Sequence, residues 1–514
     1  NQPVPARDGT VLRVNVYRPP GTGPWPVVLC AHPYGKDNLP TRKGRRLKLP
    51  VQYRAMRQTA PVEFSEYTSW EAPDPAYWTG HGYVVVNADL RGSGTSDGVG
   101  TLLSAEEGRD VADLIGWAAE QPWSTGDVGM IGVSYLAISQ YNGAAQQPPA
   151  LRCIVPWEGF TDPYRDLCRP GGVQENGFLR MWSGMMKARE TVNLAKATSV
   201  HPTRDDWWQS LMPNIDRITV PALLCTSFSD NNLHSRGTFR AFQTISSTDR
   251  FAWTHRSGKW SNFYSEEAKQ AQLAFFEHFL AGRAPRPDLP PVRLEIRDSR
   301  DHITQVRDEQ EWPLARTEWT PWHLGENGLT DPPAATAGSG TFDLRRNGLS
   351  FTRTLSEDCE LSGPMSLRLW IELDGCSDAN LFVGVEKWRN GTYIPFEGSY
   401  GFGRDRVATG WQRVSMRALD EDASLTGRPA HHYDHPEPVT PGQIVPVDVA
   451  IGPSATSFRA GDEIRLVIAG RWLWPTNPLT GQFPAHYRKG PKGRATLHWG
   501  PDRPAALTVP IIPN

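Results

Sequence analysis

The chain has 514 residues, of which 39% are hydrophobic and 21% charged, and both fractions are ordinary for a folded globular protein. Its 54 Lys and Arg nearly balance its 56 Asp and Glu, so no long-range field exists to attract nucleic acid or an anionic membrane. These figures exclude a disordered chain and favour a small-molecule partner. At roughly 100 to 200 residues per domain, the length predicts two to four domains.

The chain contains no apolar run close to the roughly 18 residues needed to cross a bilayer. It begins NQPVPARDG, without the basic and apolar regions of a signal peptide. Its six cysteines are too few for a disulfide framework, and Cys30, Cys153 and Cys225 fall in apolar, strand-like runs. We therefore expect free thiols and a cytoplasmic location. Secretion stays open, because the sequence lacks an initial Met and a leader could have been removed.

Up to about residue 285, short apolar runs alternate with helix-like segments, which is typical of a mainly parallel sheet covered by helices. The strand-like runs lie at 11–19, 26–34, 83–92, 128–135, 151–159, 220–230 and 251–255. Ser104 and Glu107 form a capping box that begins a crossover helix, and another helix is predicted from Ser265 to Gly282. The pattern predicts an α/β core in two parts, 1–159 and 219–285.

Residues 160–218 interrupt this alternation with a helical segment rich in Trp and Met, including Trp182, Met185 and Met186. An insertion between two core strands predicts a helical cap that lies as a lid over a pocket. Burial of the same side chains within the cap would explain them equally well.

A proline-rich segment, GRAPRPDLPP at 282–291, marks a domain boundary. Beyond it, runs with period-two hydrophobicity are separated by turns rich in Gly, Pro and Asp, without helices between them. These runs lie at 292–297, 366–373, 380–386, 463–470 and 506–512. They predict a β-sandwich of jelly-roll type over 290–514.

The fourth strand-like run ends at Gly132-Val133-Ser134-Tyr135 and is followed by a stretch compatible with a helix. In a nucleophile elbow, a serine occupies a strained turn between strand and helix, and small neighbours let the backbones approach closely. Gly132 meets that need, although Leu136 stands where the G-x-S-x-G form has its second glycine. Alone, such a serine is most often a turn residue or a helix cap. In this context we predict Ser134 as a nucleophile.

A serine nucleophile needs a base to remove its proton and a carboxylate to orient that base. In this architecture the chain order is serine, acid, histidine. Asp230 ends the run PALLCTSFSD, and His255 ends FAWTH. We predict these two as acid and base, with His234, in the same loop as Asp230, as the rival base. The alternatives are an Asx-turn for Asp230 and a surface loop for His255.

The tetrahedral intermediate of such a reaction also needs hydrogen-bond donors at its oxyanion. The backbone N–H of the residue after the nucleophile supplies one, which here is Tyr135. The loop after an early strand supplies the second, and there the chain reads AHPYGK. We predict the hydroxyl of Tyr34 as this donor.

Several segments together resemble the superfamily of cocaine esterase and X-Pro dipeptidyl-peptidases, over nearly the whole chain. They are RDGTVLRVNVYRP, HPYGK, DLRGSGTSDG, the GVSY elbow, PALLCTSFSD and PPVRLEIRD, in the family's order and spacing. The resemblance implies an α/β-hydrolase domain with an inserted helical cap and a C-terminal jelly roll, with the active site where the three meet. It also implies Tyr34 and Tyr135 as oxyanion donors.

The chain departs from this family's pattern at two places. Ala137 stands three residues after the serine, where members often have Gly. Around the base, members carry a segment of G-P-W-x-H type, whereas this chain reads Trp253-Thr-His255-Arg-Ser-Gly-Lys-Trp260. The second departure makes His255 the least secure member of the predicted triad.

Two further patterns bear on cofactors and metals. The cluster His431, His432, Asp434 and His435 is flanked by prolines, which favours a loop over a metal site. The glycines at 92–98 do not fall at dinucleotide-binding spacing, so we predict a turn there, with Asp89 and Arg91 as a buried ion pair beside it. No cofactor and no metal are expected.

Aromatic side chains near the catalytic loops predict an aromatic pocket, with core packing as the alternative for each of them. The candidates are Trp157, Trp182, Trp253, Trp260 and, as an acidic group, Glu158. The favoured function is cleavage of a carboxylic ester through an acyl-enzyme. Amide cleavage, by a dipeptidyl peptidase or an acylase, is the alternative, and Glu158 or Asp162 would then hold a substrate amine. A non-catalytic binding protein is the alternative of another class. The oligomeric state and the natural substrate stay open.

Overall fold

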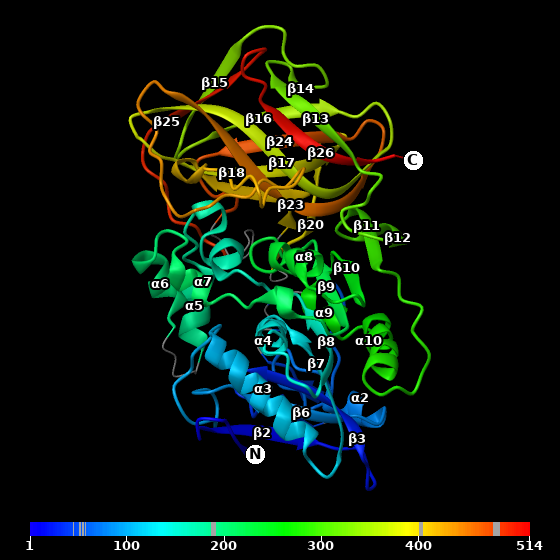
Figure 1. Ribbon diagram of the computed structural model, residues 1–514. Coiled ribbons are helices and arrows are strands. Elements are labelled where there is room, and N and C mark those ends of the chain that lie inside the picture. Colours follow the sequence, from blue (N-terminus) through cyan, green and yellow to red (C-terminus); the bar gives the residue numbers. More distant parts are fainter. Residues whose placement is uncertain are drawn as a thin grey trace.

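The computed structural model describes residues 1–44, 46–50, 53, 56, 58–186, 192–399, 404–475 and 484–513. Figure 1 shows a lower α/β part and an upper part built of strands, with the helices α5, α6 and α7 at one side between them. The N-terminus lies at the far end of the α/β part, and the C-terminus lies on the β-rich part.

The α/β part is built on a sheet with the order β1-β2-β6-β3-β7-β8-β9-β10-β11. The pairs from β6 to β11 are parallel, and β1 and β2 are antiparallel additions. The strands are β1 (Gln2–Pro5), β2 (Val11–Tyr17), β3 (Trp25–His32), β6 (Val84–Asp89), β7 (Ser124–Val133), β8 (Leu151–Trp157), β9 (Ala222–Ser227), β10 (Arg250–His255) and β11 (Val292–Ser299). A short hairpin, β4 (Thr41–Lys43) and β5 (Arg46–Lys48), precedes β6.

Helices cover both faces of this sheet, as a parallel sheet requires. They are α2 (Pro75–Gly80), α3 (Ala105–Ala119), α4 (Tyr135–Ala144), α8 (Ser235–Thr244), α9 (Lys259–Phe263) and α10 (Glu266–Phe279). Side chains alternate along β3, so that Leu29 packs in the cluster with α3 and α4, whereas Val28 packs with α2 and α10. Ser104 caps α3 by accepting from the Glu107 N–H, and Ser265 caps α10, as predicted.

The segment between β8 and β9 carries short helices and contacts both other parts. Its α-helices are α5 (Phe178–Met185), α6 (Leu194–Val200) and α7 (Asp206–Ser210). Trp182 and Trp208 are buried, whereas Met185 is 47% exposed. Both expectations for the Trp and Met side chains of this segment therefore apply, since the two tryptophans are buried and the methionine is exposed.

The β-rich part contains antiparallel pairs around a second hydrophobic cluster. Its longest strands, β17 (Cys359–Asp374) and β23 (Ile444–Phe458), pair with each other. The others are β12 (His302–Glu309), β13 (Glu318–Gly325), β14 (Gly328–Thr330), β15 (Gly338–Asp343), β16 (Gly348–Thr354), β18 (Asn380–Arg389), β19 (Thr392–Ile394), β20 (Phe396–Glu397), β21 (Arg404–Asp405), β22 (Ala408–Arg413), β24 (Glu463–Ala469), β25 (Arg494–Trp499) and β26 (Ala506–Ile512).

The strand predicted at 292–297 pairs differently from expectation. As β11 it lies between β10, to which it runs parallel, and β12, to which it runs antiparallel. Its one described pair with β23 joins Arg297 to Thr456. One strand therefore connects the two sheets. The domain limits given above, 1–159, 160–218, 219–285 and 290–514, stay predictions from the sequence.

The predicted ion pair between Asp89 and Arg91 is wrong. Arg91 donates to Asp110 through two nitrogens and to Asp8, whereas Asp89 accepts from the backbone N–H of Lys36 at 2.6 Å. β6 ends at Asp89, and the chain then turns, with the Ser93 N–H donating to the Leu90 carbonyl. Arg91 therefore lies in the turn and not on the strand, and these two side chains find separate partners.

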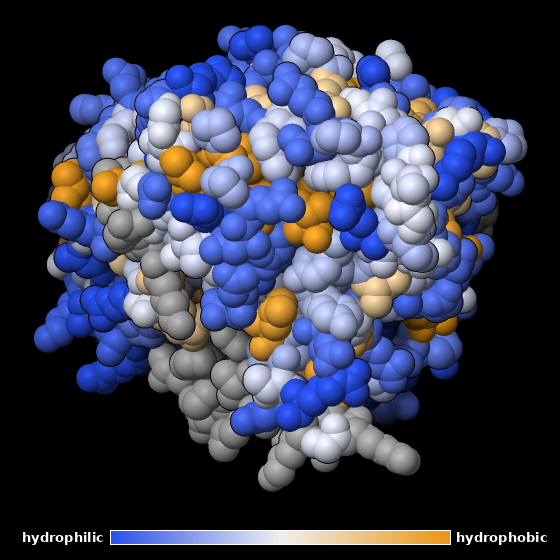
Figure 2. Space-filling view, turned by 90° about the horizontal axis from the view of Figure 1, so that it is seen from below, coloured by the Kyte–Doolittle hydropathy of each residue, from blue (hydrophilic) through white to orange (hydrophobic). Residues whose placement is uncertain are grey.

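Figure 2, which looks at the molecule from below, shows hydrophilic side chains over most of the coloured surface and apolar ones as separate small patches. No described helix is long and apolar enough to cross a membrane. All six cysteines are free; Cys30, Cys153, Cys168 and Cys225 are buried.

Candidate active site

Ser134 lies in a sharp turn between β7 and α4, with φ 61° and ψ −113°. Such a left-handed conformation is strained for a residue with a side chain, and neighbours must leave room for it. A Cβ on Gly132 would lie 2.5 Å from Leu136 Cβ, so glycine is required there. Ala137 is accommodated because its neighbour across the turn is Gly159, where an added Cβ would lie only 2.9 Å away. The elbow thus forms with Ala137 in place of the family's glycine.

The histidine that contacts Ser134 is His234, the rival base of the sequence analysis. Its Nε2 lies 3.2 Å from Ser134 Oγ, and its Nδ1 lies 2.5 Å from Asp230 Oδ2. The loop after β9 makes this possible, because the Asp230 carbonyl accepts from the N–H groups of Leu233, His234 and Ser235, which turns His234 back onto Asp230. Both His234 and Asp230 are 1% exposed. Serine, histidine and aspartate therefore form a continuous hydrogen-bonded series.

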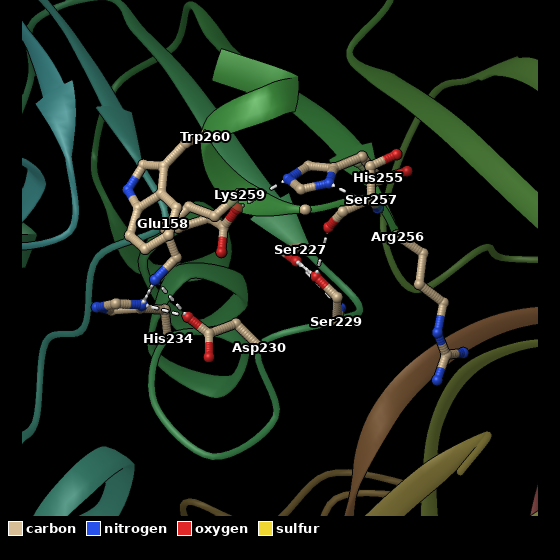
Figure 3. Close-up of polar contacts among 12 residues, drawn as sticks. Glu158, Ser227, Ser229, Asp230, His234, His255, Arg256, Ser257, Lys259 and Trp260 are labelled. Atoms are coloured by element: carbon tan, nitrogen blue, oxygen red, sulfur yellow. Dashed lines mark hydrogen bonds and ion pairs between the residues drawn. The ribbon is translucent and has the colours of Figure 1, made fainter. Parts of the chain in front are cut away.

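The structure does not bring His255 to Ser134, contrary to the sequence-based expectation. The ring of His255 is fully buried, and its Nε2 lies 2.9 Å from Glu158 Oε1. Its Nδ1 accepts from the Ser257 N–H at 3.1 Å, so the ring proton is on Nε2 and is donated to Glu158. Figure 3 shows the His255 ring apart from the pair of His234 and Asp230. With both ring nitrogens occupied, His255 has no acceptor left for a serine proton.

Lys259 joins the Asp230–His234 pair from the first residue of α9 (Figure 3). Its Nζ lies 2.7 Å from Asp230 Oδ2 and 2.9 Å from His234 Nδ1, and the residue is 7% exposed. Burial and then the charge of Lys259 lower the pKa of His234. The pKa of Asp230 is lowered in spite of its burial, chiefly by the charges of Lys259 and His234. His234 is therefore neutral and able to accept a proton near neutral pH.

Glu158 lies within the same group of charges, because oxygen and nitrogen atoms of Glu158, Asp230 and His234 approach within 4.8 Å of one another. It follows β8 with φ 54° and is fully buried. Its charge raises the pKa of His234, opposing Lys259. Glu158 was a predicted residue of the substrate pocket, but it is not among the residues that line it, and its carboxylate accepts a hydrogen bond from His255. Two carboxylates and one ammonium group thus surround His234, a net charge of −1.

The predicted oxyanion donors both lie beside Ser134. The hydroxyl of Tyr34 accepts from Trp182 Nε1 at 3.3 Å, which leaves its proton free to donate, and burial raises its pKa so that the proton stays on. Tyr135 begins α4, where backbone N–H groups have no partner within the helix. Its own hydroxyl points to Glu107, at 2.5 Å.

A pocket of about 500 Å³ opens at Ser134. Trp182 and Trp260 line it, together with Phe178 and methionines of α5. Trp157 and Trp253 do not; they pack together in the core, with ring centroids 6.1 Å apart. The expectation of an aromatic pocket holds for two of the four tryptophans, and for the other two core packing applies.

Glu71 also lines this pocket, and no sequence pattern pointed to it. Its backbone adopts φ 61°, its N–H donates to Tyr53 Oη at 3.0 Å, and Trp260 Nε1 donates to its Oε1 at 2.9 Å. Burial raises the pKa of the Glu71 carboxyl to about 7. A carboxyl that titrates near neutral pH therefore lies in the wall next to Trp260.

Two groups of described residues could supply three ligands to a metal: Glu158, Cys225 and His255, and Glu158, Asp230 and His234. Each is already joined by hydrogen bonds, and Lys259 places a positive charge in the second. Neither group includes the cluster of His431 and His432 that the sequence analysis considered.

Two protein families match this chain, one in its first half and one in its second half. Residues 8–198 match the X-Pro dipeptidyl-peptidase (S15 family), and residues 287–508 match the X-Pro dipeptidyl-peptidase C-terminal non-catalytic domain.

Three relatives show the range of similarity. A crystal structure of a CocE/NonD family hydrolase from Staphylococcus aureus is 33% identical with a TM-score of 0.94, covering 99% of this chain and 93% of that one. Cocaine esterase from a Rhodococcus strain is 28% identical over 70% of this chain and 67% of its own length. A Xaa-Pro dipeptidyl-peptidase from Lacticaseibacillus rhamnosus is 25% identical over 42% of this chain and 32% of its own. The predicted α/β-hydrolase fold with a β-rich C-terminal part is confirmed.

Proposed function

Since this chain belongs to the CocE/NonD family of hydrolases and is a serine ester hydrolase, we propose that Ser134, His234 and Asp230 form its catalytic triad. The observation that carries this assignment is the pair of contacts made by His234, 3.2 Å to Ser134 Oγ and 2.5 Å to Asp230 Oδ2. The proposal replaces the base expected from the sequence, His255.

In the proposed reaction, His234 Nε2 takes the proton of Ser134 as Oγ attacks the ester carbonyl. Asp230 keeps the proton of His234 on Nδ1 and stabilises the imidazolium that forms. The Tyr34 hydroxyl and the Tyr135 N–H donate to the oxyanion. His234 then gives its proton to the leaving alcohol, and water hydrolyses the acyl-enzyme by the same steps.

Ester preference over amide cleavage is supported by the similarity to cocaine esterase and by the pocket, whose described wall is mostly apolar. Kinetics on a matched pair, 4-nitrophenyl butyrate and 4-nitrobutyranilide, test it directly. We expect turnover of the ester and at least about 10³-fold lower kcat/KM for the anilide, since the poorer leaving group needs protonation. Comparable values for the two substrates would favour the amidase alternative instead.

Replacing Tyr34 with phenylalanine is expected to lower kcat by about 10² to 10³ with little change in KM, because one oxyanion donor is lost only in the transition state. The measurement is the steady-state kinetics of the variant with 4-nitrophenyl butyrate. An unchanged kcat would mean that another group supplies the second donor.

The opposing charges of Lys259 and Glu158 predict pH shifts of opposite sign. Lys259→Met removes a positive charge and raises the pKa of His234. In the pH profile of kcat/KM, the acid limb, where activity falls at low pH, is therefore expected to shift to higher pH by about one unit. Glu158→Gln removes a negative charge and moves the same limb down. Activity is lost as pH falls through this pKa, because a protonated His234 cannot accept the serine proton. Shifts of the same sign in both variants would contradict this electrostatic account.

A further inference from the structure

A second cavity, of about 340 Å³, lies between the α/β part and the β-rich part. Its wall combines α8 and the segment after β8 with two pieces of the β-rich part, the loop around 423–433 and residues 450–453 of β23. Its lining shares no residue with the pocket at Ser134. The volume is in the range of small-molecule sites, which begins at about 300 Å³.

Four arginines line this cavity, Arg165, Arg236, Arg240 and Arg428, and no carboxylate is among its described lining residues. Arg240 forms two hydrogen bonds with Asp166, at 2.9 and 3.0 Å. Among the described residues, the guanidinium of Arg236 donates to two backbone carbonyls, those of Asn231 and Asp166. The cavity wall is therefore strongly positive.

One more arginine of the lining, Arg165, lies near a carboxylate, but it shares that carboxylate with another arginine. Arg165 Nε lies 3.7 Å from Asp162 Oδ2, and the same oxygen lies closer, at 3.1 Å, to Arg204, which is outside the lining. Two carboxylates, those of Asp162 and Asp166, are thus the negative groups paired with the arginines of this wall. Their charge does not balance the positive charge gathered there.

Arg428 is the arginine with the least compensation. Its one side-chain hydrogen bond among the described residues goes to the neutral amide of Gln243. Burial, and the like charges of Arg240 and Arg165, lower its pKa to about 10. A half-buried guanidinium facing like charges is costly, and an anion in the cavity would relieve that cost.

The rest of the wall is apolar and aromatic, with Phe239, Trp312, Trp411 and Ile451 among its members. The guanidinium of Arg236 stacks over Trp411 at 4.7 Å from the ring centroid. Such a wall buries a hydrocarbon or aromatic body, whereas the arginines hold a negative end.

We propose that this cavity is a binding site for a small organic anion, a carboxylate attached to an apolar or aromatic body, with Arg428 as its principal charge partner. Arginine matches the two oxygens of a carboxylate with two parallel N–H groups. The site does not depend on the triad proposed above, since none of its lining residues is in that triad.

Benzoate and its neutral analogue benzamide form a matched pair of probes for this site. Binding is measured by calorimetry at low salt in an anion-poor buffer, on wild-type protein, on Arg428→Met and on Arg152→Met. Arg152 is an exposed arginine outside the cavity, paired with Asp127. We expect benzamide to bind at least about tenfold more weakly than benzoate to wild type, and Arg428→Met to weaken benzoate by about tenfold. Arg152→Met should leave the benzoate Kd unchanged.

Thermal unfolding separates a binding role of Arg428 from a structural one. Without ligand, Arg428→Met is expected to have a Tm equal to or above that of wild type, because a poorly compensated charge is removed. Equal affinity for benzoate and benzamide would overturn the proposal. So would an Arg428→Met variant that has a lower Tm and an unchanged benzoate Kd. Inorganic phosphate binding as tightly as benzoate would overturn the role of the apolar wall.

Discussion

Replacing Ser134 with alanine is expected to lower kcat/KM for 4-nitrophenyl butyrate by about 10⁶. The residual rate comes from substrate binding and the oxyanion donors, which remain when the nucleophile is gone. The substitution removes one oxygen from a turn whose backbone is determined by Gly132 and Gly159, so we expect the variant to fold. Initial rates at enzyme concentrations high enough to measure the residual activity provide the measurement.

Covalent labelling gives this variant an independent readout. A fluorophosphonate should label wild type at one site and fail to label Ser134→Ala. Ser139→Ala is the matched control, because Ser139 lies on α4, the helix that follows Ser134, and its Oγ donates to the Ala31 carbonyl, away from the pocket. Equal labelling of wild type and Ser134→Ala would remove Ser134 from the mechanism.

The nucleophile was predictable because its signals are local. A strand, a glycine and a serine in succession predict a strained turn, and the turn has φ 61° at Ser134. The same holds for the helix caps at Ser104 and Ser265, each of which needs only a side chain and a backbone N–H three residues away.

The histidine could not be chosen from chain order alone. Both His234 and His255 follow Asp230, and His255 follows a strand of its own, which favoured it. What distinguishes them is the path of the loop after β9, in which three N–H groups turn onto one carbonyl of Asp230. The four-residue spacing of Asp230 and His234 was the available signal, since residues that far apart meet on one helical turn.

The pocket walls were the least predictable part of the site. Trp157 and Trp260 are both buried tryptophans close to catalytic loops in sequence, yet only Trp260 lines the pocket. Glu71 contacts that same ring from a loop about 190 residues away. Contacts between distant segments decide such questions, and one sequence does not contain them.

Replacing His234 with glutamine is expected to lower kcat/KM by about 10⁵ to 10⁶, close to the loss at Ser134, because serine and base act as a unit. Glutamine keeps a polar side chain of similar reach but cannot accept the serine proton. The loss should persist at every pH and at lower temperature. An enzyme that was only destabilised would recover activity at lower temperature. Steady-state kinetics between pH 5 and pH 9 make this measurement.

His255→Gln is the matched comparison and decides between the two histidines. It leaves Glu158 with an amide donor instead of an imidazole, so we expect a loss of stability and a shifted acid limb of kcat/KM, with kcat reduced by less than about 10². If His255→Gln abolished turnover and His234→Gln retained it, the base would be His255. That outcome would require the loop after β9 to move His234 away from Ser134 when substrate binds. Among the residues that the structure describes, the imidazole within hydrogen-bond distance of Ser134 Oγ is that of His234, through Nε2.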